Sequence, residues 1–266
     1  MRDVPWQIRI AEKSIKKRDK LRLLDRWLAC DPSRTALDIG CAQGILSWYL
    51  RKKGGAWTSA DQDMANLKAA RELLGKGLVQ MSEGILPFRS GAFDLLTCLD
   101  YLEHIDNDDE CLRECFRVLK AGGEAVFVTP HTGGLFLLHR LRTALGMKLE
   151  FYGHKREGYS EKDLVARLRD AGFEVVRTKT YSKFASELIE LSLNLAYIRM
   201  TARGGAKKAL RDGHIRPSTA EEYDAQSGKL KVYSAVYPLI WLVSRLDLFL
   251  FFLKGYSLMV LAKKKV

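Results

Sequence analysis

Glycines and a carboxylate follow two short apolar runs in the early part of the chain. The first run, Thr35–Ile39, leads into Gly40 and Gly44, and the second ends at Asp61. Glycine lets the backbone turn tightly and approach a ligand closely, because it has no Cβ. A carboxylate at the end of a strand can accept hydrogen bonds from both hydroxyls of a ribose. The spacing is not that of a nicotinamide or phosphate loop, but it favours a site for a ligand that contains a nucleoside.

Further residues that could line the same site follow the third and fourth apolar runs. Glu83 to Ile85 come after the third run, where a purine ring could lie against Ile85. After the fourth run come Leu99, Asp100, Glu103 and His104. Any single carboxylate among them could be a solvated loop residue. Their arrival at the ends of successive runs argues for one shared site.

Two histidines are candidate general bases, since imidazole titrates near neutral pH. His104 follows the fourth run and His131 follows the fifth. Each is predicted as a catalytic residue that acts on an acceptor hydroxyl, and packing at the start of a helix is the alternative for His104. Asp100, Glu103 and His104 could together bind a divalent cation, but their spacing is not a metal signature. We therefore expect no metal.

Short strands alternate with helices along most of the chain. The apolar runs predict strands at 35–39, 56–60, 78–81, 93–99, 124–129, 173–180 and 255–262. Helices are predicted at 45–50, 64–74, 107–119 and 160–171, the third ended by Gly122 and Gly123 and the last begun by a capping box of Ser160 and Asp163. This alternation predicts an α/β fold with a parallel sheet covered on both faces. Right-handed crossovers then place the carboxyl ends of the strands at one edge, where ligands bind.

Several ordered motifs carry a resemblance to a known family. The runs LDIGCAQG, ILPFRSGAFDLLTCLDYLEHI and LRECFRVLKAGGEAVFVTPH, with Asp61 between the first two, resemble class I S-adenosylmethionine-dependent methyltransferases of the type 11 branch, which includes quinone-biosynthesis enzymes. The resemblance covers about residues 35–180, with 255–263 as the last strand. It implies a seven-stranded, Rossmann-like sheet, mostly parallel with an antiparallel last strand, and a helical insertion before that strand.

The same resemblance implies S-adenosylmethionine as the cofactor. The glycine turn would hold its methionine end, Asp61 its ribose, Glu83 to Ile85 its adenine, and Leu99 to Asp100 would back the sulfonium. The expected cofactor residues are Asp38, Gly40, Ala42, Gly44, Asp61, Gln62, Glu83, Gly84, Ile85, Leu99 and Asp100. Three residues depart from the family pattern: Ala42 and Ala121 stand where glycine and proline are usual, and Ser82 stands where an acidic residue often contacts adenine. Because a sulfonium is already activated, methyl transfer needs mainly positioning.

The net charge indicates which partners to expect, and the cysteines indicate the cellular compartment. A formal charge of +12 favours nucleic acid, an anionic membrane surface or an acidic substrate, although some soluble enzymes are simply basic. The five cysteines are odd in number and include no C-x-x-C, and no signal peptide begins the sequence. We therefore expect a cytoplasmic protein with reduced thiols, or one attached to the inner face of the membrane.

The chain divides into three predicted parts. Residues 1–30 contain an amphipathic helix at 5–29 with a basic face, and residues 31–183 with 255–266 form the methyltransferase core. Residues 184–254 are an apolar and basic insertion. Within the core, the connection 131–159 contains a predicted short helix at 135–145, and its His154 and Tyr159 are expected near the acceptor pocket.

The insertion is the most unusual part of the sequence. It predicts helices at 184–200 and 232–253, a basic patch from Arg199 to Arg216, and a polar loop at 217–229. Pro238, Arg245 and Asp247 interrupt the last apolar run, which argues against a transmembrane segment. The two helices are expected either to cover the acceptor pocket as a lid or to lie in a membrane interface, for which the aromatic residues Tyr233, Tyr237 and Trp241 are suited. A plain helical cap with a dry core is the alternative.

These features predict methyl transfer to a small or lipophilic acceptor. The apolar insertion favours such an acceptor over nucleic acid, because aromatic residues are not interleaved with Lys and Arg along one groove. No DPPY-type or NPPY-type run follows the fourth strand, which favours oxygen or carbon as the accepting atom. The alternatives are a methyltransferase for RNA or another nucleic acid, and a catalytically inactive binding protein with this fold.

Overall fold

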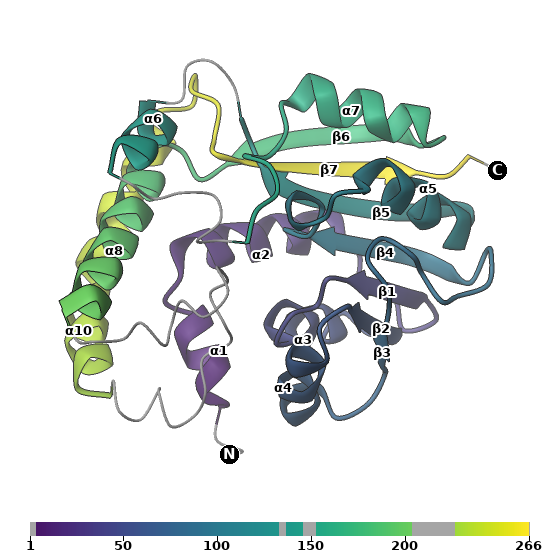
Figure 1. Ribbon diagram of the computed structural model, residues 1–266, viewed down its shortest axis with the longest axis horizontal. Helices are drawn as coiled ribbons and strands as arrows, with labels where there is room; N and C mark the ends of the chain where they lie inside the picture. Colours follow the sequence, from purple (N-terminus) through teal and green to yellow (C-terminus); the bar gives the residue numbers. More distant parts are fainter. Residues whose placement is uncertain (1–3, 133–136, 146–152, 204–226, 266) are drawn as a thin grey trace. The chain divides into compact units, whose positions relative to one another are not determined.

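Seven strands form one sheet in the computed structural model, which describes residues 4–132, 137–145, 153–203 and 227–265 (Figure 1). Their order across the sheet is β3-β2-β1-β4-β5-β7-β6. Neighbours among β1 to β5 pair in parallel, and β7 pairs antiparallel with β5. The strands are β1 Thr35–Ile39, β2 Ala56–Asp61, β3 Leu78–Gln80, β4 Phe93–Leu99, β5 Leu119–Pro130, β6 Glu174–Tyr181 and β7 Ser257–Lys263. The predicted fold class, including the antiparallel last strand, is confirmed.

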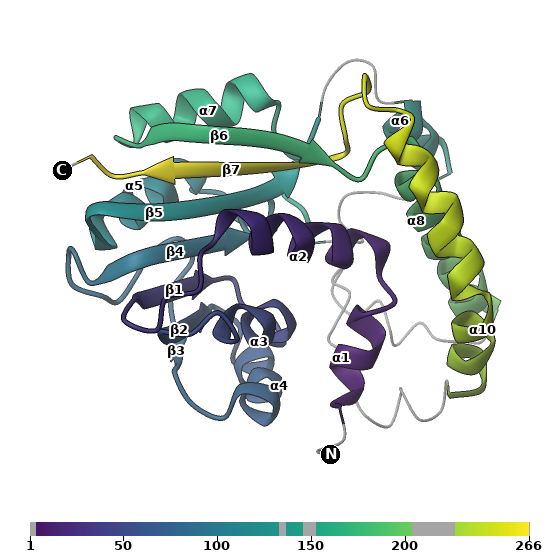
Figure 2. The same cartoon turned by 180° about the vertical axis from the view of Figure 1, so that it is seen from behind.

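Helices cover both faces of this sheet. The helices α5 Asp108–Val118 and α7 Glu161–Asp170 lie on one face, and α3 Ile45–Arg51 and α4 Met64–Leu74 lie on the other (Figures 1 and 2). A short 3-10 helix, η1 Leu102–His104, follows β4. Because both faces are covered, the central strands are almost continuously buried rather than alternating. The core includes Leu37, Leu96, Phe127 and Val260, all fully buried.

The ends of the helices follow from local side-chain chemistry. The Ser160 hydroxyl accepts a hydrogen bond from the Asp163 amide at the start of α7, as the capping box predicts. The prediction that Gly122 and Gly123 end α5 is wrong, because α5 ends at Val118 and both glycines lie within β5. The Lys264 ammonium caps the end of α5 instead, donating to the carbonyls of Phe116 and Leu119 at 2.7 and 2.9 Å.

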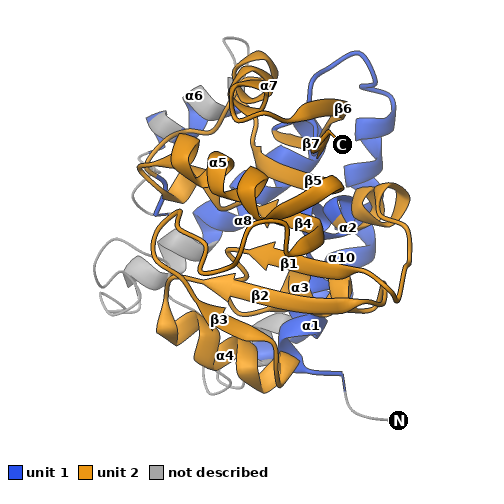
Figure 3. Ribbon diagram, turned by 90° about the vertical axis from the view of Figure 1, so that its right-hand side faces the viewer, with its two compact units in different colours: residues 1–20, 134–154, 181–256 blue, residues 21–133, 155–180, 257–266 orange. Residues whose placement is uncertain are grey.

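The chain separates into two compact units (Figure 3). Residues 21–133, 155–180 and 257–266 form the sheet unit. Residues 1–20, 134–154 and 181–256 form what we call the helical unit. The described parts of the helical unit contain α1 Trp6–Ala11, the beginning of α2 Ile15–Trp27, α6 Leu137–Ala144, α8 Phe184–Arg203, α10 Ser227–Ser244 and η3 Arg245–Leu248.

Most of the predicted helices of the helical unit are present. The helices expected at 135–145 and 184–200 correspond to α6 and α8. The helix expected at 232–253 corresponds to α10, which begins earlier than predicted, and to η3, which follows it directly. The single helix expected at 5–29 is wrong, because the Ser14 hydroxyl accepts from the Lys17 amide at 3.4 Å and starts a second helix. The basic patch beyond Arg203 and the loop at 217–226 lie outside the described residues. In the part of the chain that the structure describes, no helix combines the length and apolar character needed to cross a membrane.

A buried carboxylate holds three helices of the helical unit together. Glu187 on α8 pairs with Arg142 of α6 at 2.5 Å and with Lys16 of α2 at 2.8 Å, and its side chain is 2% exposed. Burial opposes the charge of Lys16, but the carboxylates of Glu187 and Glu190 together outweigh it and raise the pKa of that ammonium. Each ion is therefore acceptable in the interior only because the others are present.

Replacing Glu187 by glutamine is expected to destabilise the protein by about 2 kcal/mol, because the charge-assisted hydrogen bonds are lost while the two cations stay. Denaturant unfolding measures this change. Glu157→Gln, at an exposed position of the sheet unit, is the control and should change the free energy of unfolding by less than about 0.5 kcal/mol. Equal stability of the two variants would contradict a structural role for Glu187.

Candidate functional site

The turn after β1 is shaped by two glycines. Gly40 has a φ of +70° and Gly44 a φ of +79°. The amide of Gly40 donates to the Ala60 carbonyl at 2.9 Å, so the turn lies against the end of β2. A Cβ on Gly40 would lie 2.6 Å from a ring carbon of Tyr101, and one on Gly44 would lie 2.8 Å from Leu74. A side chain at position 40 would therefore clash with the Tyr101 ring, and the positive φ favours glycine at both positions.

The carboxylate of Asp61 closes the gap between the turn and the end of β2. One of its oxygens accepts from the Ala42 amide at 2.8 Å, and the other accepts from the Asp63 amide at 2.9 Å and the Asn66 side chain at 3.2 Å. An ionised carboxylate offers about four acceptor positions. Three protein donors thus leave one acceptor position for a ligand hydroxyl. The Asp61 residue is buried, with 4% of its surface exposed.

Two residues with side chains adopt left-handed backbone conformations at this edge of the sheet. Ala42 has a φ of +46° and Asp100 a φ of +53°. Such angles strain a residue that carries a Cβ, which explains why glycine is the easier choice at position 42. Hydrogen bonds hold both residues in place, from the Ala42 amide to Asp61 and from the Asp100 amide to the Val128 carbonyl at 2.8 Å.

Tyr101 is a site residue that the sequence reasoning did not identify. Its ring packs against Gly40, and its hydroxyl lies 3.4 Å from both the Gly84 amide and the Gln62 side-chain oxygen. Burial raises the pKa of this hydroxyl, so it stays a hydrogen-bond donor. Tyr101 thus joins the turn after β1 to the loops after β2 and β3. The only signal in the sequence was its position two residues after the end of β4.

The loop after β3 presents an apolar surface. Ile85 is 51% exposed although it is large and aliphatic, and Gly84 beside it is buried with a φ of +69°. The carboxylate of Glu83 accepts from the Asp106 amide at 2.7 Å, so it holds this loop to the segment before α5. Ile85 therefore offers a place for a flat ring, and a contact between Glu83 and adenine stays a prediction.

Asp38 lies beneath the turn. Its carboxylate accepts from the hydroxyls of Ser47 at 2.5 Å and Thr97 at 2.7 Å, and it is 2% exposed. These bonds tie β1 to α3 and β4. Burial raises the pKa of Asp38 to about 6, against the two hydroxyls that favour the charged form. In the structure, then, Asp38 supports the turn through its neighbours.

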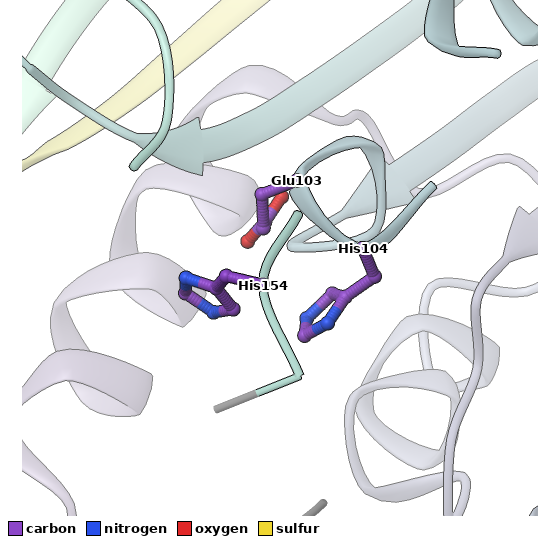
Figure 4. A group of neighbouring side chains, drawn as sticks. All are labelled: Glu103, His104 and His154. Atoms are coloured by element: carbon purple, nitrogen blue, oxygen red, sulfur yellow. The ribbon is translucent and has the colours of Figure 1, made fainter. Parts of the chain in front are cut away.

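The two candidate bases differ in accessibility. His131 follows β5, its backbone forms an isolated parallel β-bridge with that of Tyr159, and the residue is only 2% exposed. His104 ends η1 and is half-buried, and Figure 4 shows it on the same short helix as Glu103. Glu103 is buried, and its backbone carbonyl accepts from the Lys155 amide at 2.8 Å. His104 is therefore the more accessible of the two imidazoles.

Comparisons with known proteins bear on the class of domain that carries this site. Residues 37–127 match the family described as a methyltransferase domain. The chain is 31% identical over 157 residues to a ubiquinone biosynthesis O-methyltransferase of Pseudomonas paraeruginosa, a match that covers 53% of this chain and 65% of that protein. It is 33% identical over 102 residues to the protein of that name from Sodalis glossinidius, covering 36% of this chain and 41% of the relative. The matches thus span less than two thirds of these curated relatives.

Solved structures share the fold at low sequence identity. A Bacillus halodurans protein solved as a candidate methyltransferase superimposes with a TM-score of 0.61 at 21% identity, covering 93% of this chain and 100% of that one. A Haemonchus contortus phosphoethanolamine N-methyltransferase, solved with S-adenosylmethionine, gives 0.57 at 15% identity and covers 94% and 53%. A cyclase, SpnF, gives 0.60 at 18% and covers 94% and 82%. These identities establish the fold alone.

Together, the fold, the family match and the curated relatives identify the class. The chain carries a class I S-adenosylmethionine-dependent methyltransferase domain, and S-adenosylmethionine is the cofactor of this domain. The predicted recognition and cofactor are confirmed. The roles of the individual residues stay predictions, although the structure brings Gly40, Asp61, Gln62 and Gly84 together at one edge of the sheet.

Gly40→Ala is expected to destabilise the protein by about 2–4 kcal/mol, because the new methyl group meets the Tyr101 ring and the left-handed φ is unfavourable. Gly91→Ala is the matched control, since Gly91 has a φ of +63° and open space around it; it should cost about 1 kcal/mol. The double variant Gly40→Ala/Tyr101→Val should lose less free energy of unfolding than the sum of the losses in the two single variants. Urea unfolding measures all three losses. Additive losses would contradict the contact between Gly40 and Tyr101.

Asp38 should make stability depend on pH. The pKa of Asp38 in the folded protein is about 6, above its ordinary value near 4. The contribution of its protonated carboxyl to the free energy of unfolding is therefore fully present below pH about 4 and is lost as the pH rises through about 6. The loss amounts to about 3 kcal/mol. Asp38→Asn removes this dependence, so the stability difference between wild type and variant should change by this amount between pH 4 and 7 in urea unfolding. A difference that is constant over that range would contradict a raised pKa.

Proposed function

We propose that this chain transfers the methyl group of S-adenosylmethionine to oxygen or carbon of a small, lipophilic acceptor. The main support for this proposal is the set of contacts around the turn after β1. The Asp61 carboxylate accepts a hydrogen bond from this turn, and Tyr101 connects the turn to Gln62 and Gly84. Four loops from adjacent strands thus meet where a nucleoside ligand binds in open α/β sheets. The remaining acceptor position on Asp61 and the exposed Ile85 fit a ribose and an adenine.

The residues of the chain would act mainly by positioning. The glycine turn would receive the carboxypropyl end of the cofactor, Asp61 would fix the ribose, and Leu99 with the strained Asp100 would define the place of the sulfonium. When bound, S-adenosylmethionine supplies a methyl group on a good leaving group, so alignment with the acceptor provides most of the rate. A rigid, hydrogen-bonded set of loops is suited to that task.

A general base would assist transfer to a hydroxyl. We assign this role to His104, because a half-buried imidazole can reach an acceptor more readily than His131, which is 2% exposed. An imidazole that titrates near neutral pH can take a phenolic or alcoholic proton as the oxygen attacks. His131 would then contribute to the wall of the site at the end of β5.

The nature of the acceptor rests on the relatives and on the insertion. The curated relatives are named as O-methyltransferases of ubiquinone biosynthesis, which supports oxygen of a small molecule as the acceptor. The apolar residues of the helical unit support a lipophilic acceptor. We place the reaction in the cytoplasm, with the acceptor taken from the inner surface of a membrane.

Calorimetric titration with S-adenosylmethionine tests the cofactor site. Asp61→Asn should weaken binding by about 10- to 100-fold, because an amide cannot replace a charged acceptor of both protein and ribose donors. Asp63→Asn is the matched control: it lies two residues away, is exposed, and asparagine is an equally good cap for α4. Wild type that fails to bind at hundreds of micromolar, or equal affinities for the two variants, would overturn the proposal.

A further inference from the structure

The outer face of α10 is apolar and exposed. Val232, Val236, Leu239 and Val243 of α10 follow one another at steps of four and three residues, so they share one side of the helix, and Leu246 of η3 follows at the next step of three. Their exposures run from 40% for Val243 to 68% for Val232. A soluble helix normally buries such a stripe, and this one faces outward in the part of the chain that the structure describes.

Bulky side chains continue this surface beyond the helix. Leu248, Phe249, Phe251 and Phe252 are between 67% and 80% exposed. The rings of Phe251 and Phe252 meet edge to face at 5.7 Å between centroids. We call these four residues, together with the α10 stripe and Leu242, the apolar face. An exposed surface of this kind marks an interaction site rather than chance exposure.

The opposite side of α10 is occupied within the helical unit. The Tyr233 hydroxyl donates to the Lys13 carbonyl at 2.8 Å, and the Tyr237 hydroxyl accepts from Arg18 at 2.9 Å. The hydroxyls of both tyrosines are thus hydrogen-bonded to the N-terminal segment of the helical unit. Their contacts fix the rotation of α10 and so direct the apolar stripe outward.

The segment 227–256, which carries the apolar face, is basic in sequence, and its Arg245 pairs with Asp19 of α2 at 3.3 Å. Residues 227–256 contain Lys229, Lys231, Arg245 and Lys254 but only one acidic residue, Asp247. The Asp247 carboxylate accepts from the amides of Lys183, Ala185 and Ser186 at 2.7 to 3.2 Å, so it caps the start of α8. Lys231 and Lys254 are exposed at the two ends of the face. An apolar face flanked by lysines complements an anionic lipid surface.

We propose that the apolar face docks this protein on an anionic phospholipid membrane, with Phe249, Phe251 and Phe252 inserted among the acyl chains and Lys231 and Lys254 near the headgroups. A second copy of the chain is the less favourable occupant, because each copy carries a formal charge of +12 and the copies repel. The docking proposed here is to the membrane surface, and no helix among those described is suited to cross a membrane. This docking does not require methyl transfer.

Vesicle flotation tests the proposal with the full chain. Wild type should float with vesicles of phosphatidylglycerol and phosphatidylcholine, and should bind at least about tenfold less to phosphatidylcholine alone or at high salt. The variant Phe249→Ser/Phe251→Ser/Phe252→Ser should lose at least about tenfold of the binding to anionic vesicles. Val176→Ser, which changes an exposed aliphatic residue of the sheet unit, is the matched control and should bind as wild type does.

A charge variant and a solution measurement complete the test. Lys231→Glu/Lys254→Glu should weaken anionic binding, whereas Lys162→Glu on α7 should not. Wild type that stays in solution with anionic vesicles at low salt would overturn the proposal, as would a triple variant that binds unchanged. A wild-type dimer in sedimentation that the triple variant loses would also overturn it, since the face would then join two copies. Affinity for S-adenosylmethionine, measured without vesicles, should be equal in the triple variant and in wild type, which separates this proposal from the proposed function.

Discussion

The hydrogen bond from the Ala42 amide to the Asp61 carboxylate is the contact on which the site depends. It joins the turn after β1 to the end of β2, strands that are adjacent in the sheet and related by a helical crossover. Without it, the left-handed backbone of Ala42 would have no evident compensation. The same carboxylate also accepts from Asp63 and Asn66, so one side chain fixes the turn, the start of α4 and the place for a ribose.

Buried polar groups then keep this edge of the sheet rigid. Asp38 holds the turn from below through Ser47 and Thr97, and Tyr101 spans it from the side. Neither residue needs to touch a ligand to matter, because each fixes groups that would. In the helical unit, a buried ion cluster around Glu187 joins α2, α6 and α8, while α10 keeps an apolar, exposed face.

Much of the sheet and the turn could be predicted, since continuous apolar strands, glycines with a required geometry and Asp61 all leave signals in the sequence. Other features depend on tertiary contacts that no local pattern contains. An aromatic residue after a strand looks like any core residue, so Tyr101 was missed. The sequence predicted that Gly122 and Gly123 end a helix, but both glycines form backbone hydrogen bonds with Lys264 after β7 and therefore belong to β5. The outward stripe of α10 became visible only once Tyr233 and Tyr237 had fixed its rotation.

Cofactor binding at this edge of the sheet depends on the position of the Asp61 carboxylate relative to the bound nucleoside. A crystal structure of the chain with S-adenosylhomocysteine measures this directly. We expect a ribose hydroxyl within hydrogen-bond distance of the Asp61 carboxylate, with the Ala42 amide still donating to it and the adenine against Ile85. A nucleoside bound elsewhere, or an Asp61 that keeps only its protein partners while the ligand is fully ordered, would contradict the account.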